Sequence, residues 1–216
     1  MEKVIIVGAG GHAAEIRDYF YYYNNDAGTT AFDVIGFIDD NPENHEHYKY
    51  SEAYLGDIQN HEINPDASYV MGIANIKFRR VIAEKLMGKG AKFISFIHPL
   101  ATISPSAIIG TGCVISHNVS IGPKAVLGDF NILNSRCTIG HDTTVGEYNF
   151  IGPQVVFSGF TKIGNDNMFG VNAATIPGIS IGNRNIVAAG MILDKNVEDD
   201  STIFHRFKEK VIISKT

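Results

Sequence analysis

One hydrophobic pattern dominates the C-terminal half of the chain. Between residues 103 and 193 an aliphatic or aromatic residue returns at every sixth position, and only Thr175 interrupts the series. The repeating residues are Ile103, Ile109, Ile115, Ile121, Leu127, Leu133, Ile139, Val145, Ile151, Phe157, Ile163, Phe169, Ile181, Val187 and Leu193. A period of six matches neither the 3.6-residue period of an α-helix nor the two-residue alternation of an isolated sheet. It indicates a β-solenoid of hexapeptides whose repeating side chains point inward.

Glycine directly follows many of these inward positions, as in Ile109-Gly110 and Ile139-Gly140. Because glycine tolerates positive φ, we expect these positions, and Asn134 in one of the same slots, to form the corners of the solenoid. The phase never slips between residues 103 and 193, so the pattern predicts five turns of 18 residues with no inserted residue.

The N-terminal half follows a different pattern, in which short apolar runs alternate with helical periodicity. The expected strands span residues 3–7, 33–38, 68–73 and 93–97, and the expected helices span residues 12–23 and 77–87. This alternation predicts a small open parallel sheet with helices, of the Rossmann-like α/β type.

His98-Pro99 separates the two patterns. We therefore expect an α/β domain over residues 1–97 and a solenoid domain over residues 98–193. Residues 194–216 lose the period and are expected to cap the open end of the solenoid.

Composition narrows the class of protein. The 216 residues are 44% hydrophobic, and the formal net charge of −5 comes without a long basic run. Nucleic-acid binding would need a positive face, so we expect no nucleic-acid partner. No apolar stretch approaches the roughly 20 residues that cross a bilayer, and the N-terminal apolar run is too short for a signal peptide. We therefore expect no membrane insertion.

The two cysteines, Cys113 and Cys137, lie 24 residues apart. In a solenoid with three hexapeptides per turn, this spacing is one turn plus one side, so the two thiols would lie on different faces and form no disulfide. We expect both to be small core residues of a cytoplasmic protein. Two cysteines alone do not build a zinc site, and we expect no metal.

Two polar motifs lie in the α/β region. The glycine turn GAGGH at residues 8–12 follows a strand and opens a helix, where backbone N–H groups and the positive helix end suit a pyrophosphate. NAD binding and a purely structural turn are the alternatives. Asp39-Asp40 ends the second strand, where a carboxylate either binds ribose hydroxyls or stabilises a turn with Asn41-Pro42.

With GAGGHA, FIDD and IGHD accompanying a hexapeptide domain, the chain resembles the sialic-acid O-acyltransferase-type family of bacterial sugar acyltransferases. The best-known branch of that family acetylates the amino group of nucleotide-linked 4-amino-4,6-dideoxy sugars. The resemblance covers nearly the whole chain except its C-terminal end. It implies a left-handed parallel β-helix, a homotrimer, and acetyl-CoA as a co-substrate in the groove between two neighbouring subunits.

The resemblance also implies a catalytic pair, His141 and Asp142. A neutral imidazole can take the proton of an attacking amine or hydroxyl, and a carboxylate can orient the ring and stabilise the imidazolium. Adjacent residues on a strand point to opposite sides, so the pair works only if residues 141 and 142 lie at a turn. The alternative is a surface histidine on a corner. His117 occupies the same hexapeptide slot on another face, and we expect it to be an ordinary exposed histidine.

The remaining implied site residues bind the two substrates. The substrate-binding residues, for the diphosphate, the nucleoside and the sugar, are Gly10, Gly11, His12, Asp39, Asp40 and Asn134. A corner asparagine in the left-handed conformation is the alternative for Asn134. The candidates for the acetyl-CoA groove, mostly small so that the pantetheine arm can pass, are Phe150, Gly159, Gly170, Ala173, Ala188 and Ala189. Small residues at these positions would equally suit corners.

Two departures from the family pattern concern acetyl-CoA. Phe150 stands nine residues after His141, where family members often carry a second histidine near the thioester. The usual C-terminal Gly-x-Pro-Ala-Lys/Arg ending is absent, and Arg206 or Lys208 would have to meet the CoA phosphates instead.

We therefore expect an acetyl-CoA-dependent N-acetyltransferase that acts on a nucleotide-linked 4-amino-4,6-dideoxy sugar. A sugar or sialic-acid O-acetyltransferase is the alternative with the same machinery. A non-catalytic trimeric nucleotide-sugar-binding protein is the alternative of another class. The glycine turn and Asp39-Asp40 favour an acceptor that carries a nucleotide, and His141 with Asp142 argues against a non-catalytic protein.

Overall fold

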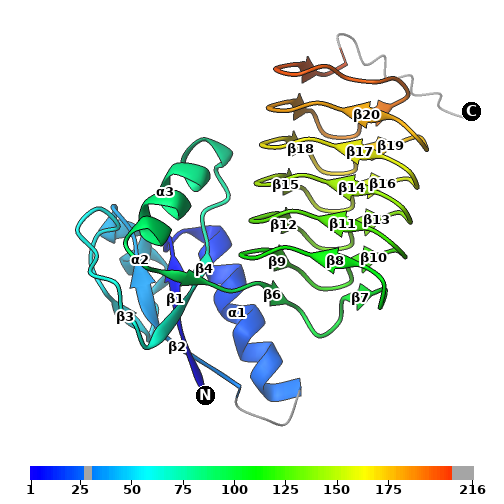
Figure 1. Cartoon of the computed structure of the whole chain (residues 1–216). Coiled ribbons are helices and arrows are strands. Elements are labelled where there is room, and N and C mark those ends of the chain that lie inside the picture. Colours follow the sequence, from blue (N-terminus) through cyan, green and yellow to red (C-terminus); the bar gives the residue numbers. More distant parts are fainter. Residues whose placement is uncertain (27–30, 206–216) are drawn as a thin grey trace, which may run out of the picture.

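A computed structural model of the chain describes residues 1–26 and 31–205 and contains two joined parts (Figure 1). The N-terminal part is a five-stranded parallel sheet in the order β3-β2-β1-β4-β5. Its elements are β1 (Glu2–Val7), α1 (Gly11–Asp26), β2 (Phe32–Ile38), α2 (Pro42–Tyr48), β3 (Ala53–Tyr54), β4 (Ala67–Met71), α3 (Ile76–Gly88) and β5 (Lys92–Phe93). The expected open parallel sheet is confirmed.

Alternating side chains of β1 explain why helices cover both faces of this sheet. Val4 and Ile6 pack in one core cluster with Ile16 and Phe20 of α1. Ile5, on the opposite face, belongs to the cluster that contains residues of α3. A strand that is buried on both faces has a continuous run of apolar residues, and residues 4–7 form such a run.

The short helix α2 was not expected from the sequence. Asn41 caps it by accepting a hydrogen bond from the Glu43 N–H, and Pro42 occupies the start of the helix. The Asn-Pro pair, interpreted as a turn, is therefore a helix start, where proline at the first position is favourable.

The expected strand over residues 93–97 is two separate strands. β5 ends at Phe93 and completes the N-terminal sheet, whereas β6 (Phe96–Ile97) pairs with β9 of the solenoid. The Ser95 hydroxyl between them donates to the Gly110 carbonyl at 2.7 Å and accepts from the Cys113 N–H at 3.0 Å. The two parts therefore meet between Phe93 and Phe96.

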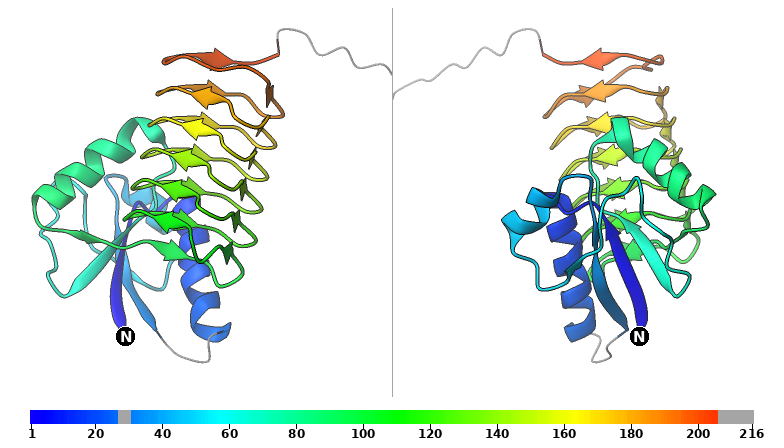
Figure 2. Two further views of the ribbon diagram at one scale, coloured as in Figure 1. Left: turned by 45° about the vertical axis from the view of Figure 1, so that its right-hand side comes forward. Right: turned by 90° about the vertical axis from the view of Figure 1, so that its left-hand side faces the viewer.

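The C-terminal part is a left-handed parallel β-helix with three sheets along its sides (Figures 1 and 2). Its two-residue strands after β6 are β7 (Thr102–Ile103), β8 (Ile108–Ile109), β9 (Val114–Ile115), β10 (Ser120–Ile121), β11 (Val126–Leu127), β12 (Ile132–Leu133), β13 (Thr138–Ile139), β14 (Thr144–Val145), β15 (Phe150–Ile151), β16 (Val156–Phe157), β17 (Lys162–Ile163), β18 (Met168–Phe169), β19 (Ala174–Thr175), β20 (Ser180–Ile181), β21 (Ile186–Val187) and β22 (Ile192–Leu193). Each strand pairs in register with the strand 18 residues away, as Ile121 does with Ile139. The period of six and its unbroken phase are confirmed.

The interruption at Thr175 has a local explanation. Thr175 is buried, and its hydroxyl oxygen accepts a hydrogen bond from the Ser158 N–H at 3.0 Å and lies 3.1 Å from the Thr161 hydroxyl. A buried hydroxyl costs little stability when it is hydrogen-bonded, so the inward position tolerates it.

The glycines that follow the inward residues are required for a reason other than the positive φ that we expected. The left-handed residues lie three positions after the inward residues from Ile109 to Val187, rather than one position after them. They are Gly112, Asn118, Lys124, Phe130, Arg136, Asp142, Tyr148, Gln154, Phe160, Asp166, Asn172, Gly178, Arg184 and Gly190. The glycines that directly follow the inward residues are needed for close stacking, because a Cβ at Gly164 would lie 2.6 Å from the Gly182 carbonyl oxygen of the next turn. The left-handed corner expected for these glycines, and left open for Asn134, is therefore wrong.

A polar ladder runs up one corner beside the apolar core. The buried side chains of Asn131, Asn149, Asn167 and Asn185 stand 18 residues apart, and each of the first three accepts a hydrogen bond from the backbone N–H of the next at 2.8–2.9 Å. The ladder satisfies buried backbone donors that the turn would otherwise leave unpaired.

The period of 18 shortens beyond Leu193. β23 (Thr202–Ile203) pairs with β21, 16 residues earlier, and Val197 forms a bridge with Ile181. Residues 194–203 therefore lose the period, as expected, but add a shortened turn to the solenoid.

The two parts pack through one side of the solenoid. The sheet that runs from β6 to β23, here named the docking sheet, presents Val114 and Ile132 to the core cluster of α1. Arg79 of α3 is fully buried and donates to the Tyr148 carbonyl. Arg80 forms a two-pronged salt bridge with Asp166, at 2.8 and 3.0 Å, and its guanidinium lies 3.9 Å from the centre of the Tyr148 ring.

Both cysteines are free and buried in the described structure. Cys113 and Cys137 belong to the core cluster of the solenoid, so the expectation that both are small core residues is confirmed. Among the described residues, no helix has the length and apolar character needed to cross a membrane.

Candidate functional site

The side chains of His141 and Asp142 contact each other on a corner of the solenoid. They follow β13, and Asp142 adopts the left-handed conformation with φ of 56°. This turn brings both side chains to the same side, so that His141 Nδ1 lies 2.9 Å from Asp142 Oδ2. The imidazole is 55% exposed and the carboxylate 34% exposed. The turn that the catalytic interpretation requires is therefore present.

The next turn of the solenoid shapes the space around the imidazole. A Cβ at Gly159 would lie 2.7 Å from His141 Nε2, so glycine is required for the ring to occupy this position. The Phe160 ring stands perpendicular to the imidazole, with the two centres 5.0 Å apart. With Nδ1–H held by the carboxylate, the lone pair of Nε2 is available to accept a proton.

The glycine turn is ordered by the first carboxylate of the Asp39-Asp40 pair. Asp39 accepts from the Ala9 N–H at 2.7 Å and from the Asn41 N–H at 2.8 Å. Asp40 accepts from the Ile58 N–H at 2.9 Å and orders a neighbouring loop. Both aspartates therefore have structural contacts, and their contact with a nucleotide stays a prediction.

The N-terminus of α1 is suited to an anion. Its first turn contains no acidic side chain, and the first backbone N–H groups of a helix have no partners within the helix. Gly10 has open space where a Cβ would lie. Gly11 lies under the Tyr48 hydroxyl, which would be 2.9 Å from a Cβ at this position.

An aromatic stack lies beside the glycine turn, and the sequence pattern did not predict it. The Tyr50 hydroxyl donates to the Ala9 carbonyl at 3.1 Å, and its ring stacks between Phe37 and Tyr48. No periodic signal marks these residues, because they come from β2, α2 and the segment that follows α2.

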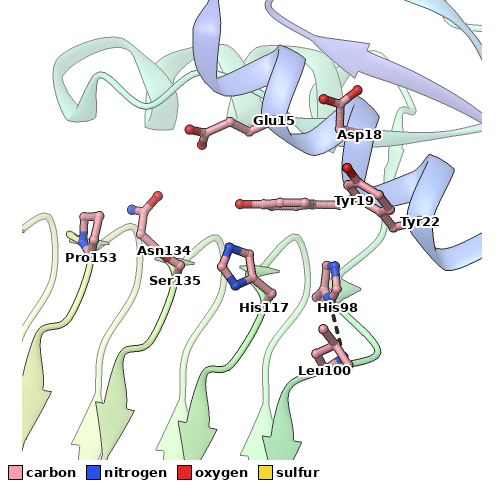
Figure 3. Close-up of a pocket in the computed structure, with 10 residues that line it drawn as sticks. All are labelled: Glu15, Asp18, Tyr19, Tyr22, His98, Leu100, His117, Asn134, Ser135 and Pro153. Atoms are coloured by element: carbon pink, nitrogen blue, oxygen red, sulfur yellow. Dashed lines mark hydrogen bonds between the residues drawn. The ribbon is translucent and has the colours of Figure 1, made fainter. Parts of the chain in front are cut away.

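A pocket of about 410 Å³ lies between α1 and the solenoid (Figure 3). We call it the α1 pocket, and its lining residues are Glu15, Asp18, Tyr19, Tyr22, His98, Leu100, His117, Asn134, Ser135 and Pro153. In Figure 3, Glu15 and Tyr19 point toward the solenoid side, where Asn134 and His117 face them, whereas Asp18 points away. We expected His117 to be an ordinary exposed histidine. It lines this pocket instead, so the expectation is wrong.

The polar groups of this pocket are held in place. Asn134 is buried and its Nδ2 donates to the Ile151 carbonyl at 2.9 Å. His12 Nδ1 lies 3.5 Å from Glu15 Oε2, and this hydrogen bond lowers the pKa of Glu15 despite the opposing effect of burial. His12 Nε2 is buried and has no hydrogen-bond partner in the described part of the chain. The second stripe of α1, with Glu15, Tyr19 and Tyr22 at helical spacing, is the sequence signal that could have revealed the pocket.

The expected site residues of the solenoid, apart from Phe150 on β15, divide between two corners of one chain. The corner that follows β7, β10, β13, β16 and β19, here named the histidine corner, carries His141, Asp142 and Gly159. The corner that follows β6, β9, β12, β15, β18 and β21, here named the pocket corner, carries the other small positions and Asn134. These small positions are Gly170, Ala173, Ala188 and Ala189.

The candidate residues for the acetyl-CoA groove differ in their exposure. Ala189 is exposed, whereas Ala173 is buried in the solenoid core, so only its backbone could line a groove. Phe150 lies on the docking sheet, partly buried against the α1 cluster, with its ring centre 6.5 Å from that of His12. Arg206 and Lys208 lie outside the described residues.

Comparisons with known proteins agree with this architecture. Residues 3–86 match the family described as PglD N-terminal domain, and residues 161–195 match the family described as hexapeptide repeat of succinyl-transferase. The UDP-N-acetylbacillosamine N-acetyltransferase of Bacillus subtilis (strain 168) is 35% identical over 120 residues, which are 53% of this chain and 51% of that protein. The match thus spans about half the length of this curated relative.

Two solved structures resemble the whole chain. The acetyltransferase domain of PglB from Neisseria gonorrhoeae FA1090, in complex with acetyl coenzyme A, has a TM-score of 0.80 and 27% identity, covering 93% of this chain and 95% of that one. PerB from Caulobacter crescentus, in complex with CoA and GDP-perosamine, has a TM-score of 0.79 and 25% identity, covering 94% and 93%.

A parallel α/β domain docked on a hexapeptide solenoid is the architecture that this chain has in common with these two solved structures. Residues 3–86 thus match a PglD N-terminal domain, and the fold of the whole chain is similar to the folds of the PglB acetyltransferase domain and of PerB.

Proposed function

We propose that this protein is an acetyl-CoA-dependent N-acetyltransferase that acetylates the amino group of a nucleotide-linked 4-amino-4,6-dideoxy sugar. The observation that carries the proposal is the His141–Asp142 contact of 2.9 Å on an open corner of the solenoid. The relatives support the class of acceptor: one is named for a UDP-linked sugar, and PerB was solved with GDP-perosamine.

In the proposed reaction the amine nitrogen attacks the thioester carbonyl carbon of acetyl-CoA. The C–N bond forms, the C–S bond breaks, and the CoA thiolate leaves. His141 Nε2 accepts the proton that the nitrogen loses and returns one to the thiolate sulfur, so the products are the acetamido sugar and CoA. Asp142 holds the ring and stabilises its cationic form, and backbone N–H groups stabilise the oxyanion.

The glycine turn supplies the proposed diphosphate site. Gly10 leaves open space at the N-terminus of α1, where backbone N–H groups without helical partners would bind the diphosphate, and His12 lies beside them in the first turn. In this proposal Asp39 and Asp40 order the surrounding loops and contact the nucleoside through their remaining lone pairs.

The proposal includes a homotrimer, because the two corners must meet. The histidine corner of one copy and the pocket corner of its neighbour would form a groove in which acetyl-CoA lies against small positions such as Gly170 and Ala189. Exposed apolar side chains beside the histidine corner support such a contact, among them Phe160 at 57% and Ile192 at 67% exposure. Apolar area of this kind is typical of surfaces that a partner covers.

The test is CoA release from acetyl-CoA with a panel of UDP-, GDP- and dTDP-linked 4-amino sugars. We expect release with at least one amino sugar and none with its 4-hydroxy counterpart. Release with sialic acid but with no amino sugar would replace the proposal with O-acetyl transfer. Tight binding of a nucleotide sugar without release of CoA would indicate a non-catalytic binding protein.

A further inference from the structure

The α1 pocket contains charges that the proposed reaction has not yet used. Glu15 is the charged side chain that points toward the solenoid side of the pocket, and it is 59% exposed (Figure 3). Its pKa is lowered, first by the hydrogen bond from His12 and further by the nearby His117, so the carboxylate is ionised at neutral pH. The pocket therefore presents a negative charge at the place where α1 and the solenoid face each other.

The pocket lies at the right distance from the proposed diphosphate site. Glu15 is four residues after Gly11, where α1 begins, and this is roughly 6 Å along the helix axis at 1.5 Å per residue. A group attached to a diphosphate at the helix end can reach this next turn. In a nucleotide sugar the two attached groups are the nucleoside, which the proposed function places at Asp39 and Asp40, and the sugar ring, which is left for the pocket. A pocket of about 410 Å³ is large enough for it.

The lining suits a sugar ring with a basic nitrogen. Tyr19 offers an apolar ring face, while Glu15 and Asn134 offer acceptor oxygens toward each other across the pocket. Because Asn134 Nδ2 is engaged with the Ile151 carbonyl, its Oδ1 is the atom available to a ligand. Glu15 and Asn134 thus each provide an acceptor oxygen, and that of Glu15 is charged.

Counting donors separates an amine from a hydroxyl. A protonated amine carries three N–H donors and a positive charge, whereas a hydroxyl carries one O–H donor and no charge. Glu15 and Asn134 can accept two of the three, and Nε2 of His141 from a neighbouring copy can accept the third. A hydroxyl can donate one hydrogen bond to Glu15 but brings no positive charge to the carboxylate.

We propose that the α1 pocket is the site of the acceptor sugar, and that Glu15 is the residue that selects an amino sugar over a hydroxy sugar. This inference rests on the proposed function, because the third acceptor belongs to the catalytic pair. One N–H proton of the bound ammonium passes to His141 Nε2 and then to solvent. The neutral amine that remains attacks the thioester as described above.

The experiment uses the full-length protein and three variants. Glu15→Gln keeps the shape and an acceptor oxygen but removes the charge, and Glu15→Leu removes both. Asp66→Asn makes the same change of charge at an exposed loop position before β4 and is the matched control. The amino-sugar nucleotide that the wild type uses and its 4-hydroxy analogue are compared in calorimetric binding and, for the amino sugar, in steady-state kinetics.

We expect Glu15→Gln to raise KM for the amino sugar about tenfold, in line with the loss of one charged hydrogen bond at a half-exposed site. We expect kcat to stay within about twofold, because His141 is intact. The binding preference for the amino sugar over the hydroxy analogue should fall by the same factor, and Glu15→Leu should lower it further. Asp66→Asn should behave as the wild type.

The inference and the proposed function fail in different ways. If the wild type releases CoA and Glu15→Gln keeps its full preference for the amino sugar, the assignment of Glu15 is overturned while the reaction stands. If the wild type prefers the amino sugar in binding, and loses that preference in Glu15→Gln, but releases no CoA, the pocket is supported and the reaction is overturned. A preference that disappears equally in Asp66→Asn would reflect overall charge and would also overturn the inference.

Discussion

The two parts of this protein obtain their order over different distances along the chain. In the solenoid each strand pairs with a strand 18 residues away, and the same contact recurs from turn to turn. In the N-terminal part the glycine turn is held by Asp39, 30 residues away, and covered by Tyr50, 41 residues away. The comparison teaches that a repeated local contact gives a scaffold that can be read from sequence, whereas the binding features depend on single contacts between distant segments.

The chemistry follows the same division. His141 and Asp142 are neighbours in sequence and come together through one left-handed residue. The α1 pocket instead combines one helix with four separate turns of the solenoid, from His98 to Pro153.

The largest expected effect concerns the local pair. Replacing His141 by Ala should lower kcat by at least about 100-fold, because general-base catalysis typically contributes that much or more. The Tm should not change, because the His141 side chain is exposed and is not part of the core. Release of CoA with the amino-sugar substrate measures the effect, and His47→Ala, at an exposed position of α2, is the control. A kcat within twofold of the wild type would show that His141 is not the base.

The second prediction contrasts two glycines. Gly164→Ala should lower the free energy of unfolding by about 1–3 kcal/mol, because its Cβ would lie 2.6 Å from the Gly182 carbonyl oxygen. This oxygen belongs to the backbone and cannot rotate away as the end of a side chain could. Gly10→Ala should leave stability unchanged, because open space surrounds its Cβ, but should raise KM for the nucleotide sugar. Urea denaturation and steady-state kinetics give the two readouts. Equal stability of the two variants would mean that the turns can separate at no cost.

A smaller effect is expected at the contact between the two parts. Arg80→Ala removes the salt bridge to Asp166 and the contact with Tyr148, and should cost about 1 kcal/mol, since the pair is partly exposed. Lys77→Ala, at an exposed position of the same helix, is the control. Thermal unfolding measures both. No change in Arg80→Ala would show that burial of α3, and not this ion pair, holds the two parts together.

The smallest effect is the pH response of the two thiols. Burial raises the pKa of Cys113 to about 11 and that of Cys137 to about 12. Because the fold favours the neutral thiols, their contribution to stability is complete below the ordinary thiol pKa and is lost as the pH rises toward these raised values. Iodoacetamide at pH 8 should therefore label neither cysteine in the folded protein and both in urea. Rapid labelling of the folded protein would contradict the burial.

The solenoid was predictable in detail because each turn repeats the same local rule. The period predicted the register, the number of turns and the position of His141 two residues after the inward-facing Ile139. The period wrongly predicted positive φ at the glycines that follow the inward residues. These glycines are needed for the close stacking of turns, and the distance between turns cannot be derived from a single hexapeptide. The left-handed corner positions are held by residues as different as Phe130 and Asp142, so residue type does not reveal them.

The N-terminal domain was predictable at the level of its main strands and long helices. α2 and β3 were missed, since a short helix of polar residues and a two-residue strand have no apolar period. The strand expected over residues 93–97 was also interpreted as one element, because its apolar run continues while the chain passes from one sheet to the other.

By itself, the sequence determined the solenoid and its register, the α/β character of the first half, and the His141–Asp142 pair. These features depend on contacts between residues that lie close together or at a fixed interval. Tertiary structure alone decided that Glu15, His117 and Asn134 face one pocket and that Asp39 orders the glycine turn. The physical reason is that the docking of α1 on the solenoid sets these neighbours, and docking depends on the packing of many side chains at once rather than on any repeating spacing.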